Sequence, residues 1–586
     1  MFLRQRARER IARERLLYQR RSGGELSVCV VYPNVYRLAM ANLGFQAVFQ
    51  IFDSHRLVDA DRAFLPDPDE LAAMRTRGRL VSFEQGRPLS DFDIIAFSVA
   101  FETDYLNLLA ILDLAGIPAR RRSRANRAYP LVICGGSAVF LNPEPIADFV
   151  DLFLIGEGEE MVPEFLERYA AARKLGTAEL LDAVSEIGGA YRPERFNPVY
   201  NESGRLVELA FSGMGEPRVS RRVVRNLDRF PTASRILTEE SVFGDMYLVE
   251  ASRGCQWGCR FCAAGFMYRP IRYRAPEGLA EEARRGLAER QVIGLVGAEM
   301  ASVPGVAGLA AEVAARGGRL SPSSLKADCI TPALAAALTR AGSHSVTIAP
   351  EAGSERMRKV INKNLSEPQI LGAAELLVGH GVENLKLYFM VGLPEEHEED
   401  VLAMAELTGK ILARTRGAGR PVGHVTVSLN PFVPKPWTPF QWDPMEPPQS
   451  LKRKIALLRS ALGRLDGVEL DAESPREAYF QALVSRGDRR VGAILERLCA
   501  AQCQGSGDIW RELRMIRREA HATVDSALVD PDAYVTRRFG HDELLAWDFI
   551  DHHVHKWFLL SERKKAHFEH QTKPCDVTRC RVCGAC

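Results

Sequence analysis

Short apolar runs alternate with amphipathic stretches through the amino-terminal third of the chain. The runs at 26–32, 93–100, 129–134 and 151–155 are short and apolar, and helical patterns or glycine turns follow them. Buried strands that alternate with helices are typical of a doubly wound parallel sheet. The pattern therefore predicts an α/β domain with a Rossmann-type sheet over 26–190, and ligands would bind beyond the carboxyl ends of its strands.

A second strand–helix series begins after 191–240, a segment rich in arginine and proline that we expect to be a linker with short strands. Repetition of this kind predicts a partial (β/α)6 barrel of the TIM type over 241–445, short of the usual eight units. Beyond it, 446–570 is expected to be a mostly helical domain. The six predicted barrel strands are 246–251, 292–297, 325–327, 345–349, 385–391 and 425–429.

Charge is balanced overall but uneven along the chain. The 586 residues carry a net charge of only +2, which gives no reason to expect an acidic partner, nucleic acid or a membrane. Segment 1–25 is an exception, because 4–21 holds eight arginines against two glutamates. This basic arm is a solvated amphipathic helix, an arm that binds RNA phosphates, a disordered tail, or a segment packed against a domain. Since no apolar run is long enough for a membrane span or a secretory signal, we expect a cytoplasmic protein.

The placement of the cysteines indicates metal ligation. Of twelve cysteines, seven lie in two tight groups at 255–262 and 575–586. A secreted disulfide framework would not place thiols two and three residues apart in so long a chain. In the first group, Cys255, Cys259 and Cys262 form C-x3-C-x2-C directly after the first barrel strand. Three such thiolates can hold three irons of a 4Fe–4S cubane and leave the fourth iron open to a cofactor or substrate. Zinc would need a fourth ligand, which no nearby His or Cys supplies.

The loop ASRGCQWGCRFCAAGFMYRP (251–270) resembles that of the radical S-adenosylmethionine (SAM) superfamily. The resemblance implies that the open iron chelates SAM and that an electron from the cluster cleaves it to a 5′-deoxyadenosyl radical. Motifs at 297–299, 350–354 and 385–396 resemble further elements of the superfamily, although Ala298 replaces its middle glycine. Glu299 would hold the methionine ammonium, and the alternative is that it is a surface carboxylate. Glu351 would hold the ribose, and the alternative is that it caps the following helix. The residues implied to contact SAM are Phe261, Gly297, Glu299, Glu351 and Ser354.

The amino-terminal sheet, with its CGGS and GEGE turns, resembles the cobalamin-binding domain of one large branch of the superfamily. The runs at 259–274, 350–363 and 430–442 resemble an uncharacterised bacterial subfamily of that branch with a cysteine-rich tail. The cobalt-ligating Asp-x-His-x-x-Gly is absent after the first strand, so the alternative is a sheet that only covers the barrel mouth or binds another ligand. The residues that cobalamin would contact are Ser98, Gly135, Gly136, Ser137, Gly156, Glu157 and Gly158.

The metal-binding tail at 571–586 carries the second cysteine group in the spacing C-x4-C-x2-C-x2-C. Four thiolates satisfy either zinc or a second 4Fe–4S cluster, which could relay electrons, anchor a substrate or donate sulfur. Just upstream, His552, His553 and His555 are expected on a polar helix face. The four tail ligands are Cys575, Cys580, Cys583 and Cys586.

These features predict a radical SAM enzyme, of the class that transfers a methyl group to an unactivated carbon with the help of cobalamin. The substrate is unspecified, with RNA or protein among the options, and the expected reductant is a flavodoxin or ferredoxin. Two enzymatic alternatives are a methylthiotransferase and a rearrangement without cobalamin. The alternative from another class is a non-catalytic iron–sulfur protein that binds RNA.

Overall fold

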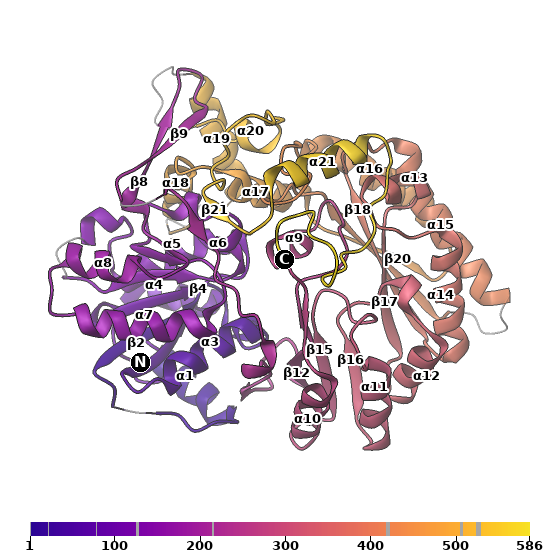
Figure 1. Ribbon diagram of the computed structural model, residues 1–586, viewed down its shortest axis with the longest axis horizontal. Coiled ribbons are helices and arrows are strands. Elements are labelled where there is room, and N and C mark those ends of the chain that lie inside the picture. Colours follow the sequence, from indigo (N-terminus) through magenta and orange to yellow (C-terminus); the bar gives the residue numbers. More distant parts are fainter. Residues whose placement is uncertain are drawn as a thin grey trace.

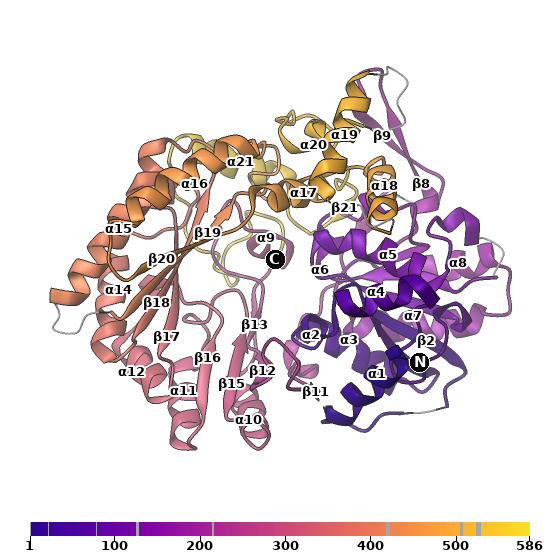
Figure 2. The ribbon, with the colours of Figure 1, turned by 180° about the vertical axis from the view of Figure 1, so that it is seen from behind.

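The protein consists of two α/β halves with a carboxyl-terminal region that crosses both of them (Figure 1). This computed structural model describes the chain apart from residues 1, 22, 78, 125–127, 214–215, 418–421, 504–507 and 523–528. In Figures 1 and 2 the amino-terminal half lies on one side and the barrel half on the other, with the carboxyl terminus between them.

The amino-terminal half is built on one six-stranded sheet in the order β3-β2-β4-β5-β6-β7. Neighbouring strands are parallel, except that β7 runs antiparallel to β6. Helices α3 (Leu43–Ser54) and α7 (Gly158–Ala172) pack on one face and α5 (Tyr105–Ala115) on the other. The predicted doubly wound sheet is therefore confirmed. Its strands are β2 (Leu26–Tyr32), β3 (Val58–Phe64), β4 (Ile94–Ser98), β5 (Leu131–Gly135), β6 (Leu152–Leu154) and β7 (Ala190–Tyr191).

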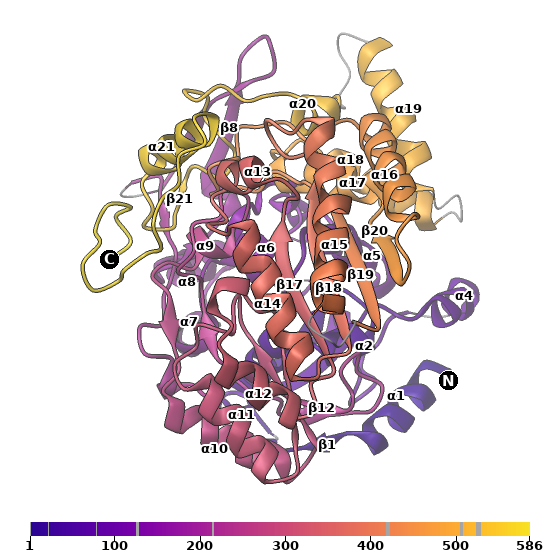
Figure 3. The same cartoon turned by 90° about the vertical axis from the view of Figure 1, so that its right-hand side faces the viewer.

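The second half is an open barrel of parallel strands. One sheet has the order β12-β15-β16 and the other β17-β18-β19-β20, and a single bridge between Leu325 and Ile348 joins them. Figure 3 shows helices α12 (Pro332–Arg340), α14 (Glu367–His380) and α15 (Glu398–Gly417) on the outside. The strands are β12 (Met246–Glu250), β15 (Val292–Val296), β16 (Arg319–Pro322), β17 (Ser345–Glu351), β18 (Asn384–Val391), β19 (His424–Pro431) and β20 (Val468–Ala472).

The partial barrel is confirmed, but one predicted strand was wrong and another was missed. The third strand is Arg319–Pro322, whereas 325–327 contributes only the Leu325 bridge before the turn of 3-10 helix at Ala327–Cys329. Strand β20 continues the sheet into 446–570, which the sequence predicted to be mostly helical. The inner face of the barrel is only partly filled, since every second residue of β18 is half-buried and the others are buried against the outer helices.

The carboxyl-terminal region ties the two halves together. Helix α18 (Val491–Cys503) packs on α5, and β21 (Ile550–Asp551) pairs with β10 (Val219–Ser220) from the predicted linker. Arg489, just before α18, forms an ion pair of 2.9 Å with Glu144 of the amino-terminal half. Helices α17 (Pro475–Arg486), α19 (Ile509–Ala522) and α21 (Lys556–His567) complete this region.

The basic arm packs against the amino-terminal half. Helix α1 (Phe2–Arg13) places Arg10 2.5 Å from Asp67 and 3.0 Å from Glu240. Just after the helix, Glu14 accepts from the buried Arg62 of β3 at 2.6 Å. Of the alternatives for this arm, packing against a domain is the one that the structure shows. Among the described residues, no helix is both long and apolar enough to cross a membrane.

Candidate active site

The three-cysteine loop lies between β13 (Ser252–Arg253) and the short helix α9 (Ala264–Met267). Cys259 is buried, and Cys255 and Cys262 are half-buried. Arg260 fixes the loop to the segment after β17: its backbone N–H donates to Ile361, and its fully buried guanidinium donates to the carbonyls of Lys359 and Val360. The loop is therefore held from within by a side chain that lies between two of its cysteines.

The three thiols lie close enough to affect one another electrostatically. Burial, together with the neighbouring Cys259 and Cys262, raises the pKa of Cys255 to about 12. Burial also raises the pKa of Cys259 to about 11, while Lys363 and Lys326 lower it. Iron would have to displace these protons, because the thiolate is the ligand. A cubane on three thiolates is anionic, so two adjacent cations and three converging thiols fit such a group.

The described residues contain no group of three His, Cys, Asp or Glu side chains placed as ligands of one metal ion. A cubane makes a different demand from a single ion, because each cysteine binds its own iron and the sulfurs need not meet at one point. For a cubane, the relevant feature of this loop is therefore that each of its three thiols can bind a separate iron.

Two of the residues predicted to contact SAM lie just beyond the carboxyl end of β15. Glu299 accepts from the backbone N–H groups of Ala301 at 2.6 Å and Ser302 at 3.0 Å, which holds its own turn in shape. A Cβ at Gly297 would lie 2.3 Å from the terminal methyl of Met300 and 2.7 Å from the hydroxyl of Ser252, so a larger residue would have to displace these side chains. A carboxylate accepts about four hydrogen bonds, so Glu299 keeps acceptor capacity for a ligand.

Strand β17 ends at Glu351, whose φ of 66° is uncommon for a non-glycine residue. Its carboxylate lies 3.3 Å from the ammonium of Lys363. The suggestion that Glu351 caps the next helix is wrong, because Ser354 is the N-cap of α13 (Glu355–Val360) and accepts from the N–H of Met357 at 3.0 Å. The Ser354 hydroxyl also donates to Asp400, so its predicted contact with SAM would compete with these two bonds.

Phe261, the remaining predicted SAM contact, is half-buried in a small apolar cluster next to the loop. This cluster includes Ala352 and Met357, which follow β17, and Phe432, which follows β19. The structure thus brings the three-cysteine loop, the end of β17 and the end of β19 to one edge of the barrel. The assignment of these residues to SAM stays a prediction.

A cavity of about 450 Å³ separates this edge of the barrel from the carboxyl ends of the amino-terminal strands. On the barrel side it is lined by Ser252, Arg253, Gly254, Gly297 and Ala298. Its lining, as far as the structure describes the chain, contains no histidine. The opposite wall includes every residue predicted to contact cobalamin: Ser98, Gly135, Gly136, Ser137, Gly156, Glu157 and Gly158.

Two of these glycines are required by the backbone itself. Gly136 has φ 109°, and a Cβ there would lie 2.3 Å from the carbonyl oxygen of Val99. Gly156 has φ 130°, and its Cβ would lie 2.4 Å from the backbone nitrogen of Arg222. Both positions would select glycine even without a ligand, so the glycine-rich turns are not by themselves evidence for cobalamin.

Glu157 joins the two halves of the protein. It is buried, and its carboxylate lies 2.7 Å from Arg272 and 3.2 Å from Arg253, both of the barrel half. Burial alone would raise the pKa of Glu157, but Arg272 and Arg253 hold it below its usual value. Arg253 also pairs with Glu159 at 2.8 Å. Sequence reasoning missed these arginines, although Arg253 lies two residues before Cys255.

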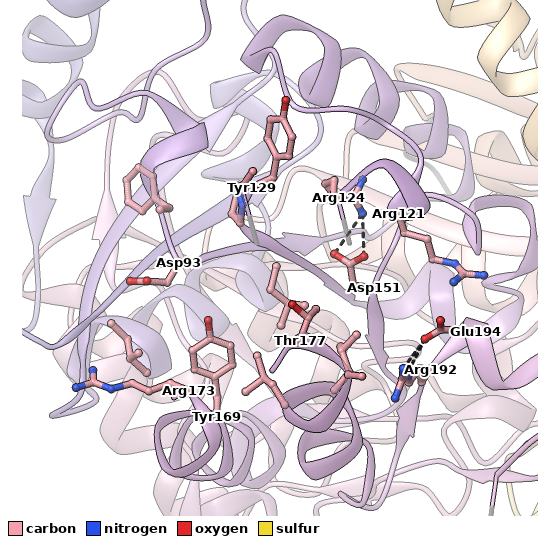
Figure 4. Close-up of a pocket in the computed structure, with 18 of the residues that line it drawn as sticks. Asp93, Arg121, Arg124, Tyr129, Asp151, Tyr169, Arg173, Thr177, Arg192 and Glu194 are labelled. Atoms are coloured by element: carbon pink, nitrogen blue, oxygen red, sulfur yellow. Dashed lines mark hydrogen bonds and ion pairs between the residues drawn. The ribbon is translucent and has the colours of Figure 1, made fainter. Parts of the chain in front are cut away.

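A larger cavity, of about 660 Å³, lies at the opposite edge of the amino-terminal sheet (Figure 4). Two of the arginines in its lining are engaged in ion pairs: Arg124 lies 3.2 Å from Asp151, and Arg192 pairs with Glu194. Its lining includes Asp93 and Leu131, at the start of strands. Open α/β sheets bind ligands at the carboxyl ends of their strands, so the smaller cavity is the better candidate.

The four tail cysteines are also brought together. Cys583 is buried, Cys575 and Cys580 are half-buried, and Cys586 is exposed. Burial raises the pKa of Cys575, and each of the other three thiols raises it further. The predicted polar helix face for the upstream histidines is wrong, because His552 is fully buried and the helix α21 begins only at Lys556.

Comparison with known proteins gives two family matches. The model for the amino-terminal region of radical SAM proteins matches residues 44–193, and the model for the radical SAM superfamily matches 249–408. The first match covers most of the amino-terminal sheet, and the second covers the three-cysteine loop and the barrel as far as α15. The two matches together include all the residues predicted to contact the site cluster, SAM and cobalamin.

One curated relative is the uncharacterized protein MJ0966 of Methanocaldococcus jannaschii, 27% identical over 475 residues, or 80% of this chain and 90% of that protein. Among solved structures, the radical SAM methyltransferase TsrM from Kitasatospora setae has a TM-score of 0.51 at 13% identity. It aligns over 84% of this chain and 99% of its own. The cobalamin-dependent radical enzyme OxsB has a TM-score of 0.47 at 14% identity, over 92% of this chain and 79% of its own. At these identities the likeness to TsrM shows a shared fold.

Proposed function

This chain belongs to the radical SAM superfamily, and on that premise we propose that it is a cobalamin-dependent methyltransferase acting on an unactivated carbon. As a radical SAM enzyme it uses a 4Fe–4S cluster and SAM. When bound, the cluster supplies the electron that cleaves SAM to a hydrogen-abstracting 5′-deoxyadenosyl radical. Cobalamin would supply the methyl group.

One observation carries the proposal. The carboxyl ends of β4, β5 and β6 share a single cavity with the residues that precede Cys255 and with the end of β15. A methyl donor on the sheet and a radical formed at the loop would therefore face the same substrate position. Bringing reactive groups into one enclosed site lowers the entropic cost of their encounter.

The chain's own residues would hold the cluster and balance its negative charge. Cys255, Cys259 and Cys262 would ligate the cluster, while Lys326 and Lys363 offset its negative charge. Lys326 is held in place by Asp328 at 2.6 Å and lies 3.8 Å from the ring centre of Trp257. This arrangement fixes a cation next to the loop without exposing it to solvent.

The fold that this chain shares with TsrM supports the proposal, because that protein is a methyltransferase and has been solved with cobalamin and a 4Fe–4S cluster bound. Methylthio transfer and a rearrangement without cobalamin are the competing enzymatic functions. A non-catalytic role in RNA binding is less favoured, because Arg10 of the basic arm is engaged in ion pairs with Asp67 and Glu240.

The test is anaerobic reconstitution with iron, sulfide and cobalamin, followed by product analysis under dithionite. Wild-type protein is expected to retain cobalamin and to form 5′-deoxyadenosine, together with S-adenosylhomocysteine from methylation of the cobalt. Ala47→Trp would fill the cavity from α3, on the side away from the cysteines. It is expected to lose cobalamin and S-adenosylhomocysteine while still forming 5′-deoxyadenosine.

Two controls bracket this result. Cys255→Ala should abolish 5′-deoxyadenosine altogether, and Ala311→Trp on the exposed face of α11 (Val306–Ala315) should behave as wild type. Wild-type protein that cleaves SAM but retains no cobalamin would leave the family assignment intact and refute the methyltransferase.

A further inference from the structure

The carboxyl-terminal tail is attached directly to the three-cysteine loop. The backbone N–H of Cys575 donates to the carbonyl of Gln256 at 2.8 Å, next to Cys255. Asn362 makes a second link, since its side chain donates to Gly258 at 3.0 Å and accepts from the N–H of Thr572 at 2.8 Å.

The tail is folded rather than merely adjacent. The carbonyl of Cys583 accepts from the N–H of His555 at 2.9 Å, and Cys583 belongs to the main apolar core. Gly584 has φ 90°, and a Cβ there would lie 2.5 Å from Nε2 of His555, so the chain can pass this ring only at a glycine. The buried Cys583 and exposed Cys586 make the cysteine group span from the interior to the surface.

Arg269 lies between the two cysteine groups. It is buried, and its guanidinium would be 3.7 Å from a Cβ on Gly258, beside Cys259. Burial raises the pKa of the tail thiols Cys575 and Cys586, and the same guanidinium opposes that rise. A fixed cation here would stabilise the extra negative charge that a reduced cluster carries.

The surface around the tail suits a charged protein partner. Large apolar side chains are exposed at Trp557, Phe568 and Val582, with exposed fractions of 56%, 65% and 57%. Exposed basic side chains accompany them at Arg579 and Arg581. Val582 directly follows Arg581, and an apolar side chain beside basic ones, as in this patch of Arg579, Arg581 and Val582, is typical of a docking site for an acidic protein.

We propose that the four tail cysteines bind a second 4Fe–4S cluster, and that this cluster is the entry point for the electron that reaches the SAM-binding cluster. The donor would be an acidic one-electron carrier, such as a flavodoxin or ferredoxin, docked on the patch. The carrier loses one electron, and the tail cluster gains it. The tail cluster then passes the electron to the SAM-binding cluster through the hydrogen bond between the backbone N–H of Cys575 and the carbonyl of Gln256. No covalent bond or proton changes place in this relay, and the proposal requires the radical SAM chemistry but not cobalamin.

The cluster is tested by metal content and spectroscopy. Anaerobically reconstituted wild-type protein should hold about eight irons, in two 4Fe–4S clusters. The double variant Cys583→Ala, Cys586→Ala, which keeps only two tail thiols, should hold about four and retain one reduced-cluster EPR signal that SAM perturbs. That retained signal also shows that the variant is folded. Wild-type protein with about four irons, or with zinc in the tail, would overturn the proposal.

The electron path is tested by comparing two reductants. With dithionite, which reaches the inner cluster directly, the double variant Cys583→Ala, Cys586→Ala should form 5′-deoxyadenosine at close to the wild-type rate. With reduced flavodoxin or ferredoxin the rate should fall at least tenfold. Equal rates with the carrier in both proteins would refute the relay while leaving SAM cleavage intact.

Charge reversal separates docking from cluster binding. Arg581→Glu should keep about eight irons but raise the KM for the carrier, most strongly at low salt, because steering by surface charges is screened by salt. Arg514→Glu, on the exposed surface of α19, is the matched control and should leave the KM unchanged. An unchanged KM in Arg581→Glu would contradict the proposed docking surface.

Discussion

His552 is a buried imidazole that the protein keeps uncharged. Its Nε2 lies 2.7 Å from the carbonyl oxygen of Phe140. Its ring packs edge-on against Trp437, with 4.9 Å between the two ring centroids. Burial, together with the nearby Arg221, lowers the pKa of His552 to about 3. The residue therefore links the carboxyl-terminal region to the amino-terminal half without adding charge to either.

This lowered pKa predicts a specific loss of stability in mild acid. Unfolding exposes an imidazole with a pKa of about 6.5, so the unfolded chain binds one more proton than the folded chain between that pH and about 3. The contribution is complete above the unfolded pKa and is lost as the pH falls. Between pH 7 and 5 the free energy of unfolding should decrease by about 2 kcal/mol.

The check is denaturant unfolding at several pH values. His552→Asn cannot titrate, so its free energy of unfolding should depend less on pH by this amount, although its value at pH 7 should be lower. His380→Asn, at an exposed position at the end of α14, should keep the wild-type pH dependence. An identical pH dependence in His552→Asn and wild type would contradict the assignment.

At the residue scale, sequence reasoning succeeded where the partners are close in the chain. Cys255, Cys259 and Cys262 must share one loop because of their spacing, and the structure places their thiols within electrostatic reach. Pairs such as Glu157 with Arg253 could not be predicted from the sequence, because 96 positions separate the two residues and no local pattern indicates their contact. Glu157 was accordingly assigned to a ligand, although the structure engages it in a buried ion-pair network.

At the scale of the element, the strands that were not predicted from the sequence contain polar residues or proline, which are uncommon in buried strands. Strand β3 contains Asp61 and Arg62, both buried. The buried Arg62 requires the distant partners Glu14 and Glu84. Strand β16 contains Pro322, which normally argues against a strand interior. Half-buried and exposed residues alternate along strand β20. This period of two was not recognised in the sequence, because helical patterns surround it.

Helix α13 offers a prediction at the scale of the element. Ser354 satisfies one of the free N–H groups at its start, and replacing such a cap by alanine costs about 1 kcal/mol. Ser354→Ala should therefore speed hydrogen exchange at the amide of Met357 about fivefold, while Ser354→Asp should preserve protection. Isothermal titration of SAM into the reconstituted proteins then separates the two roles. A large loss of affinity with unchanged exchange would show that Ser354 contacts SAM rather than capping the helix.

At the scale of the whole molecule, the candidate cavity exists only because two halves are held in register. Glu157 is the centre of that contact, with Arg272 at 2.7 Å and Arg253 at 3.2 Å, and the carboxyl-terminal region closes the other side through β21 and β10. Breaking a buried ion pair by removing one partner costs about 3–5 kcal/mol, because the remaining charge is left unpaired. Here Arg272 would lose its ion pair with Glu157, whereas Arg253 would keep Glu159 at 2.8 Å and Glu250 at 2.9 Å.

Glu157→Gln should therefore loosen the contact between the halves. We expect faster hydrogen exchange on both walls of the cavity and faster proteolysis within 191–240, while the core of each sheet stays protected. Glu160→Gln is the matched control on the same helix, since its pairing with Arg229 at 3.7 Å is exposed and worth less than about 1 kcal/mol. Because a ligand that binds only the closed arrangement stabilises it by mass action, SAM or cobalamin should restore protection in Glu157→Gln. If exchange in the absence of ligand matched wild type, the two halves would not depend on this ion pair, and the cavity would be held by the carboxyl-terminal region alone.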